Sequence, residues 1–378
     1  MRTQVVVAAV FTALAVSSCV VFNGLGLPEG DAGALDGTPP KCALSQGGLE
    51  SDAENCGACG RVCESGQCNG GICVPKAIFQ GKDLIGEIDA NDTEVAWRVL
   101  PNRVFHTQLA NLDAAEEVKI AEADPISAVQ GLILIPSSTY YLVVSADGAT
   151  KGTGAIFGVK RDGTSITLSN NSYHAEHLRR QGVALFTSRP TYDIIGECTC
   201  GASCDCRDHA GIVEDQFTTT DNRIYWFDPT RRLLACNRDV NDCAKGRTIV
   251  DDVHTTESLR ALAGDGDLVA WSVQSEGNVY VCRERSTATS DAGVLGCEPR
   301  LLATGQSSPN AVHADRAAGR ISWLTLSGTL ASCPADGCPD AGPTLHARGL
   351  TAPRGLVKSK SSFIVIDRDV DLVQVPIF

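Results

Sequence analysis

Four tryptophans at a regular spacing constrain the fold of this 378-residue chain more than any other feature. Each lies in a short apolar run typical of a β-strand, as in Ile224–Phe227. Counting at a period of about 43 residues reaches similar runs at Leu142, Ala184 and Ile366. The chain therefore carries seven strands in one phase of a repeat. The tryptophans, which are all that the chain contains, are Trp97, Trp226, Trp271 and Trp323.

Each repeat predicts four short strands. In the unit around Trp271, a strand over 259–263 precedes a Gly/Asp turn, the tryptophan strand, an alternating strand over 278–282 and a last strand over 300–303. Repeats of roughly 40–50 residues with four strands are typical of propeller blades. We therefore predict an all-β fold, a seven-bladed β-propeller of four-stranded antiparallel blades over residues 74–378, with six and eight blades as alternatives.

The repeat also predicts the role of the tryptophans and the closure of the ring. A four-stranded blade cannot bury both faces alone, so large apolar side chains on its second strand fill the space between blades. We interpret the tryptophans as core residues rather than ligand-stacking residues. The last repeat lacks a fourth strand, and Val74–Phe79 precedes the first repeat. We expect this segment to complete the last blade, as propellers commonly do.

The 17 cysteines predict a disulfide-rich, exported protein. Three pairs follow their tryptophan strands at the same phase, and we expect each pair to bridge the loop between the third and fourth strands of its blade. A disulfide that closes a loop this short stabilises the fold by roughly 2–3 kcal/mol on a chain-entropy estimate. The pairs are Cys236–Cys243, Cys282–Cys297 and Cys333–Cys338.

A denser cysteine run lies in the third repeat, where His209 follows it closely. Its members are Cys198, Cys200, Cys204 and Cys206. We favour two crossing disulfides in a hairpin, such as Cys198–Cys206 and Cys200–Cys204. Because clustered cysteines beside a histidine are also typical of metal sites, a metal site is the alternative.

Residues 1–18 predict an export signal. Arg2 precedes an apolar run from Val5 to Val16, which is too short to span a membrane. The run ends in Ser17-Ser18-Cys19, and the whole resembles the lipobox of bacterial lipoproteins. The resemblance implies a diacylglycerol anchor on Cys19 and no spanning helix. The odd cysteine count agrees, because lipidation of Cys19 leaves an even number for disulfides.

The residues after Cys19 refine this expectation. Val20, which is not aspartate, implies the outer membrane under the familiar sorting rule for such lipoproteins. Residues 19–41 are rich in glycine and proline, and we expect them to form a lipidated, flexible tether.

Residues 42–73 predict a small cysteine-rich module. The run Asn55-Cys56-Gly57-Ala58-Cys59-Gly60-Arg61-Val62-Cys63, with Gly71-Ile72-Cys73 beyond it, resembles the cysteine motif of stigma-specific-like proteins. A module this short has almost no hydrophobic core, so we expect three disulfides to stabilise it. The sequence does not show which cysteines pair with which. The alternatives are a redox pair at Cys56 and Cys59, and a metal or cluster site that adds Cys63. The six cysteines are Cys42, Cys56, Cys59, Cys63, Cys68 and Cys73.

Charge and motifs limit the function. Lys and Arg number 32 against 45 Asp and Glu, and a net charge of −13 argues against a nucleic-acid partner. The sequence shows no nucleophile elbow, phosphate loop, dinucleotide fingerprint or zinc-protease motif, so we predict no catalytic residue, cofactor or metal. We predict a non-enzymatic binding or protein-interaction module at the bacterial cell envelope, whose partner is an unknown protein or glycan. The alternative is a propeller-type glycoside hydrolase or lyase with carboxylates at the channel mouth.

Overall fold

The computed structural model describes residues 48–377, with gaps at 60, 64, 112–114, 119–125, 136–140, 149–153, 170–175, 182–183, 190–193, 201–203, 211–216, 228–232, 240, 242, 244–247, 250–258 and 285–297. The predicted signal segment, Cys19, the tether, Cys42 and Cys297 lie outside the described residues. The described part contains β-strands and one short 3-10 helix, η1 (Gly48–Glu50). None of its helices is long and apolar enough to cross a membrane.

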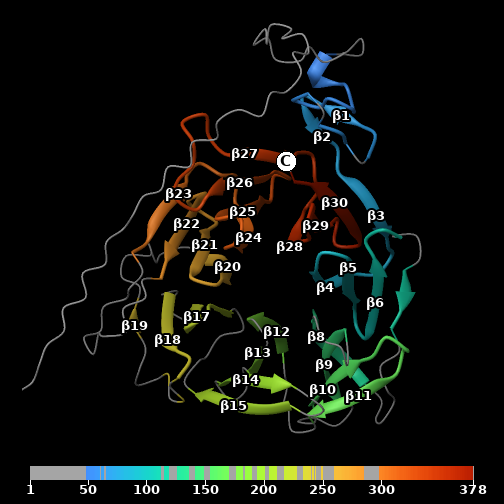
Figure 1. Cartoon of the computed structure of the whole chain (residues 1–378), viewed down its shortest axis with the longest axis vertical. Helices are drawn as coiled ribbons and strands as arrows, with labels where there is room; N and C mark the ends of the chain where they lie inside the picture. Colours follow the sequence, from blue (N-terminus) through green and yellow to red (C-terminus); the bar gives the residue numbers. More distant parts are fainter. Residues whose placement is uncertain are drawn as a thin grey trace, which may run out of the picture. The chain divides into compact units, whose positions relative to one another are not determined.

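Seven four-stranded antiparallel sheets form a β-propeller ring (Figure 1), as predicted. The innermost strands of blades one to seven are β4 (Ile85–Ala90), β8 (Ile126–Leu134), β12 (Glu176–Gln181), β16 (Phe217–Thr219), β20 (Leu259–Asp265), β24 (Pro309–Asp315) and β28 (Arg354–Lys358). The second strands are β5 (Glu94–Val99), β9 (Leu142–Gly148), β13 (Ala184–Arg189), β17 (Arg223–Phe227), β21 (Leu268–Val273), β25 (Arg320–Thr325) and β29 (Ser362–Asp367).

The outer half of each blade follows in the same order. The third strands are β6 (Arg103–Gln108), β10 (Gly154–Val159), β14 (Ile194–Cys200), β18 (Leu233–Asn237), β22 (Asn278–Arg283), β26 (Leu330–Pro334) and β30 (Asp371–Pro376). The outermost strands are β7 (Glu116–Glu117), β11 (Ser165–Ser169), β15 (Cys204–Ala210), β19 (Thr248–Ile249), β23 (Arg300–Ala303), β27 (Thr344–Ala347) and β3 (Lys76–Gln80). Two further strands, β1 (Cys68–Asn69) and β2 (Ile72–Cys73), pair in the cysteine-rich segment.

The seventh blade closes the ring with a strand from the other end of the chain. β3 pairs antiparallel with β30, and Ala77 lies opposite Val373. The innermost strands contact one another in a closed cycle, from β4 through β28 and back to β4. The predicted non-covalent closure is therefore confirmed, and it leaves no gap between the first and last blades.

The hydrophobic core lies between the blades. The buried apolar residues form seven clusters in this ring, each shared by two neighbouring blades. All four tryptophans are at most 1% exposed, and each packs toward the preceding blade. Their predicted role as core residues is confirmed.

In two blades, the 43-residue period misplaces by one residue the position equivalent to the tryptophan. Ala184 and Ile366, which the 43-residue count assigns to the tryptophan phase, pack toward the following blade. Leu185 and Val365 occupy the tryptophan side of their strands. Side chains alternate between the two faces of a strand, so a change of one residue in a loop reverses the face to which the count points.

Polar side chains also link the blades near the ring's centre. Each innermost strand is a sheet edge whose free N–H and C=O groups need partners. Side chains or backbone groups of a neighbouring blade provide several of them, so the inner edge of the ring is tied together by hydrogen bonds and ion pairs. The links are Arg354 to Ile85, Glu87 to Leu132, Gln181 to Asp221, Asp221 to Gly266, Arg316 to Asp265 and Lys358 to Asp315.

Candidate functional site

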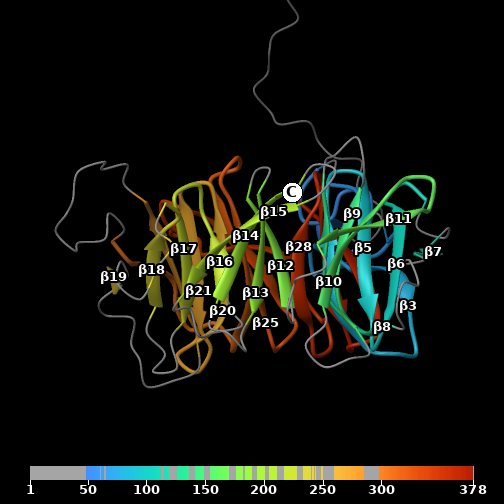
Figure 2. The same ribbon diagram turned by 90° about the horizontal axis from the view of Figure 1, so that it is seen from below.

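One end of the ring gathers charged residues. The strands run between two ends of the ring (Figure 2), and the turns from first to second strands share one end with the loops from third to fourth strands. Three of these turns and one loop carry five charged residues, which we name the rim cluster: Asp221, Asp265, Asp267, Arg283 and Arg316. We regard this cluster as the candidate binding site.

Arg316 is the centre of the rim cluster. Its Nη1 lies 2.9 Å from Asp221 Oδ2, two blades away. Its backbone N–H donates to Asp265 Oδ2 at 2.8 Å, and its Nε lies 3.6 Å from Asp267 Oδ1. Arg283 pairs with the other oxygen of Asp267 at 2.9 Å. Three carboxylates and two guanidinium groups are thus held across blades four, five and six.

A glycine makes this arrangement possible. Gly266 has a φ of +60°, a conformation that side chains other than glycine rarely adopt. A Cβ at this position would lie 2.0 Å from Cδ of Arg316. The turn Asp265-Gly266-Asp267 therefore lets the arginine side chain cross directly over its backbone.

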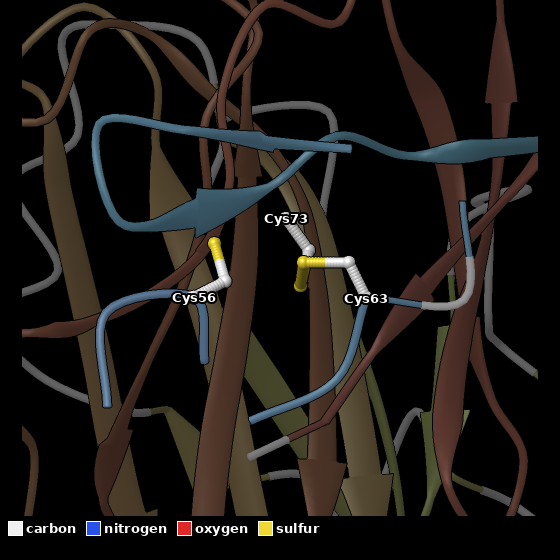
Figure 3. Close-up of side chains that lie close together, drawn as sticks. All are labelled: Cys56, Cys63 and Cys73. Atoms are coloured by element: carbon white, nitrogen blue, oxygen red, sulfur yellow. A yellow bond between two sulfur atoms is a disulfide. The ribbon is translucent and has the colours of Figure 1, made fainter. Parts of the chain in front are cut away.

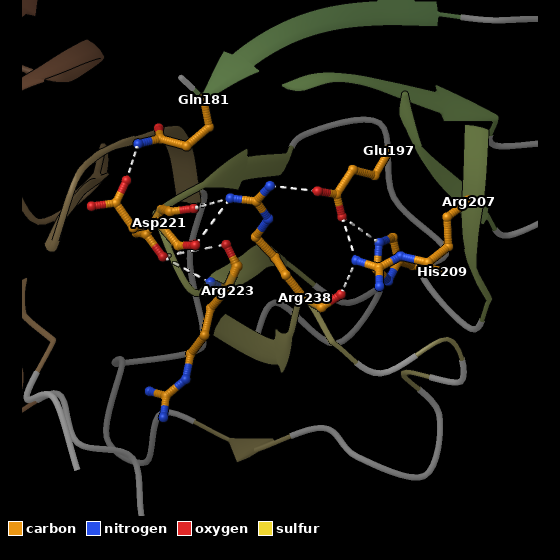
Figure 4. A network of polar contacts seen from close by, with 8 residues as sticks. Gln181, Glu197, Arg207, His209, Asp221, Arg223 and Arg238 are labelled. Carbon is orange, nitrogen blue, oxygen red and sulfur yellow. Dashed lines mark hydrogen bonds and ion pairs between the residues drawn. The ribbon is translucent and has the colours of Figure 1, made fainter. Parts of the chain in front are cut away.

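A second polar network surrounds Glu197 on β14 (Figure 4). Arg207, directly opposite on β15, donates to Glu197 Oε2 at 2.7 Å, and the buried His209 lies 3.1 Å from the same oxygen. Arg238 of blade four binds Glu197 Oε1 and donates to the carbonyl of Asp221 at 3.0 Å. Its guanidinium carbon lies 4.9 Å from the ring centroid of Phe186. Arg238 therefore connects the Glu197 network to the rim cluster.

The environment of Glu197 favours a role in holding neighbouring arginines in place rather than in proton transfer. Burial by itself would raise the pKa of Glu197, but hydrogen bonds from Arg238, Arg207 and His209 outweigh it and lower the pKa to about 2. Such a carboxylate stays ionised near neutral pH. It is a poor general acid and a strong acceptor for the two arginines.

Two further carboxylates lie on the innermost strand of blade one. Glu87 Oε2 accepts the N–H of Leu132 at 3.2 Å, and Asp89 Oδ2 accepts that of Leu134 at 2.7 Å. Glu87 also pairs with Arg179 of blade three at 3.2 Å. Burial raises the pKa of Asp89 to about 6, despite the opposing hydrogen bond from Leu134. Asp89 can therefore carry a proton in mildly acidic solution.

The cysteines of the blades lie where their strands turn. Cys236–Cys243 and Cys333–Cys338 are disulfides between third and fourth strands. Cys198 and Cys206 face one another across β14 and β15 and are joined, with a Cα–Cα distance of 4.0 Å. Cys282 is disulfide-bonded. Cys200 lies opposite Cys204 in the register of the same hairpin. The side chains of both residues lie outside the described ones.

Among the described side chains of this hairpin, His209 points away from Cys206. It is three residues from Cys206 on the same strand, so the two side chains point to opposite faces. Cys206 faces the core between blades two and three, whereas His209 contacts Glu197. The alternative of a metal ion bound by Cys206 and His209 therefore has no geometric support.

Two disulfides are described in the cysteine-rich segment, Cys56–Cys68 and Cys63–Cys73. Cys59 is also disulfide-bonded, so it does not form a dithiol pair with Cys56. The sulfurs of Cys56, Cys63 and Cys73 lie within 4.8 Å of one another (Figure 3). In this oxidised state they are not thiolates and do not offer metal ligands.

Close backbone contact explains the glycines of this motif. Gly57 and Gly71 both have a φ of +74°. A Cβ on Gly57 would lie 2.3 Å from the carbonyl oxygen of Gly71. Glycine is therefore needed at both positions to bring the segment after Cys56 against the segment before Cys73.

The sequence analysis did not predict the rim cluster, although its residues lie in recognisable turns. Asp221-Asn222 and the Gly/Asp turn over 264–267 have the composition of ordinary hairpin turns. Their recurrence after the first strand of successive blades was a usable signal, because that phase places them at one end of the ring. Glu87, Asp89 and Glu197 carried no such signal.

Comparisons with known proteins identify the architecture and no family. No protein-family profile matches the chain, and no curated protein does. The solved structures that are similar include virginiamycin B lyase from Staphylococcus aureus, with 9% identity, a TM-score of 0.53, and coverage of 79% of this chain and 96% of that one. A streptogramin B lyase shows 11% identity and a TM-score of 0.54, covering 80% of this chain and 96% of that one.

A protein of another class is equally similar. A chain of the mitotic checkpoint complex has 10% identity and a TM-score of 0.57, with coverage of 81% of this chain and 92% of that one. Altogether 1304 solved chains are similar, so the likeness establishes the propeller fold and does not choose among functions.

Proposed function

We propose that this protein is an exported, lipid-anchored binding module that engages a protein partner at the bacterial cell envelope through the rim cluster. The lipobox-like Cys19 supports the anchor, and the five disulfides between described cysteines agree with an oxidising compartment. The rim cluster carries the proposal because it is both ordered and accessible.

Exposure and charge make the rim cluster suitable for recognition. The side chains of Arg316, Asp221 and Arg283 are 55%, 49% and 48% exposed, although each is held in an ion pair. Charges fixed in this way lose little freedom on binding, and they favour partners with a complementary pattern. The excess of carboxylates in the cluster and the net charge of −13 favour a partner with a basic surface.

The exposure of the described aromatic side chains favours a protein partner over a glycan partner. Glycan sites commonly present an aromatic ring to the sugar face, and here none of the Phe, Tyr and Trp side chains whose burial is described is exposed. The exposed large apolar residues among those described are aliphatic: Val62, Leu84, Leu100, Leu301 and Leu326. Between the two partner classes, a protein therefore fits the described surface better.

Crosslinking in native cells tests the proposal. The chain carries a C-terminal tag, and the variants are Arg316→Glu and, as a matched control, Arg103→Glu. Arg103 is 39% exposed and paired with Asp83 at the opposite end of the ring. We expect one near-stoichiometric partner whose recovery falls at least tenfold for Arg316→Glu only. Equal recovery from both variants, or no discrete partner, contradicts the proposal.

The anchor needs a separate test. Fractionation of cells that produce Cys19→Ala should move the protein from the membrane to the soluble fraction. Retention of the variant in the membrane fraction would show that Cys19 is not the attachment point.

A lyase or glycoside hydrolase is the second candidate, and Asp89 is the observation that favours it. Its pKa of about 6 suits a general acid, and Glu87 lies two residues away on the same strand face. Both carboxylates accept backbone N–H groups of β8, which gives them a structural role as well. Turnover of glycans or of streptogramin B by the wild type, lost in Asp89→Asn, would establish this candidate over the first.

A further inference from the structure

The two described disulfides of the cysteine-rich segment are close enough to react with one another. Cys56 is bonded to Cys68, and Cys63 to Cys73. The Cys56 sulfur lies within 4.8 Å of both sulfurs of the second disulfide. Cys68 is not one of these three clustered cysteines. Cys68 nevertheless packs against these three residues and lies opposite Cys73 in the β1–β2 register, so Cys56 is distinguished by its closeness to both sulfurs of the second disulfide.

Exposure differs between the same four residues. Cys56 is 0%, Cys63 3% and Cys73 1% exposed, whereas Cys68 is only partly buried. Thiol–disulfide exchange begins when a thiolate reaches a sulfur, so access selects the sulfur that is attacked. Among these four, a thiol from solution reaches Cys68 most easily.

We propose that this segment is a thiol–disulfide exchange site, in which Cys68 receives an external thiol and Cys56 passes the exchange to Cys63–Cys73. The ligand class is a small or protein thiol present as its thiolate. The proposal uses the placement of the four sulfurs and is independent of the function proposed above.

The chemistry balances in two steps. The external thiolate attacks Cys68 Sγ, a mixed disulfide forms there, and the bond to Cys56 breaks so that Cys56 leaves as a thiolate. The Cys56 thiolate then attacks Sγ of Cys63 or Cys73. Their disulfide breaks, a new one forms to Cys56, and the displaced cysteine leaves as a thiolate that takes a proton from water.

A pair of serine variants of the full chain separates this proposal from a purely structural role. Cys68→Ser leaves the Cys56 thiol beside the second disulfide, and we expect it to exchange without added reductant. Cys56→Ser leaves the Cys68 thiol, which packs against the cluster without being one of its three sulfurs, and we expect most of the Cys63–Cys73 disulfide to persist. In a purely structural pair of disulfides, both variants would keep Cys63–Cys73 intact.

Tryptic digestion shows whether Cys56 has become bonded to Cys63 or Cys73. Cleavage after Lys41, Arg61 and Lys76 places Cys56 on one peptide, and Cys63 and Cys73 on the next. After alkylation and non-reducing digestion, Cys68→Ser should yield these two peptides joined, with the alkyl group on Cys63 or Cys73, in more than half of the material. Unlinked peptides with alkylated Cys56 overturn the proposal.

The wild-type protein supplies a measurement that does not depend on how the variants fold. Among Cys56, Cys63, Cys68 and Cys73, mass mapping under graded reduced glutathione should find the first adduct on Cys68, followed by a bond from Cys56 to Cys63 or Cys73. A first adduct on Cys63 or Cys73 while Cys56–Cys68 is intact overturns the proposal.

Discussion

Tyr225→Phe tests the polar contact between blades four and five. The phenol of Tyr225, which is 0% exposed, donates to Glu284 Oε1 at 2.6 Å. Glu284 is 8% exposed, and its other partners are Thr220 at 2.8 Å and Asn222 at 3.4 Å. Burial and the neighbouring Glu284 charge raise the pKa of Tyr225, so the phenol remains a donor through neutral and alkaline pH.

The expected loss follows from these contacts. Removing the hydroxyl deletes a hydrogen bond to a charged group and leaves a buried carboxylate with one donor fewer. Such bonds contribute about 1.5–3 kcal/mol. We expect the free energy of unfolding to fall by about 2 kcal/mol, roughly a thirtyfold change in the folding equilibrium. Equilibrium unfolding in urea, under non-reducing conditions, measures the change.

Tyr280→Phe is the matched control. The Tyr280 hydroxyl accepts a bond from the neutral amide of Asn278 at 3.3 Å, and the ring is only partly buried. Its removal should change the free energy of unfolding by at most about 0.5 kcal/mol. If Tyr225→Phe changes stability no more than this control, the contact with Glu284 does not stabilise the blade interface.

Three further predictions concern the charged end and the ring. Glu197→Gln should destabilise the protein above pH 4.5. Because the pKa of Glu197 is lowered to about 2, the difference from wild type should shrink as the pH falls from 4.5 toward 2, and urea titrations at pH 6, 4 and 3 will show this trend or refute it. Gly266→Ala should displace Arg316 and halve or further reduce partner crosslinking while the far-ultraviolet spectrum is unchanged; undiminished crosslinking would mean that this arginine's position is unimportant. A chain that starts at residue 82 lacks β3 and should unfold at a urea midpoint at least 1 M below that of a chain that starts at residue 74, whereas equal midpoints would show that β3 contributes nothing to closure.

The fold followed from local patterns. Strand alternation and the spacing of Trp226, Trp271 and Trp323 predicted the blades, because every blade must bury an equivalent side chain against its neighbour. The missing fourth strand of the last repeat predicted the role of β3. At Ala184 and Ile366, where no tryptophan marked the phase, the count missed the correct strand face by one residue.

The candidate site was much less accessible to sequence reasoning. Asp221, Asp265 and Arg316 come from three blades and lie up to 95 positions apart, yet they form one cluster. Glu197 looked like any charged strand residue until Arg238 of the next blade was placed beside it. Cross-blade contacts of this kind depend on loop lengths, twist and side-chain reach, and no local pattern encodes them.

The sequence by itself therefore determined the seven-bladed architecture and the pairing of Cys236 with Cys243 and of Cys333 with Cys338, because both depend on residues close in the chain or on a repeated spacing. The tertiary structure decided which charges meet at the rim of the ring and which sulfurs of the cysteine-rich segment face one another. The physical reason is that ion pairs and thiol exchange act over a few ångströms in space, whatever the separation along the chain.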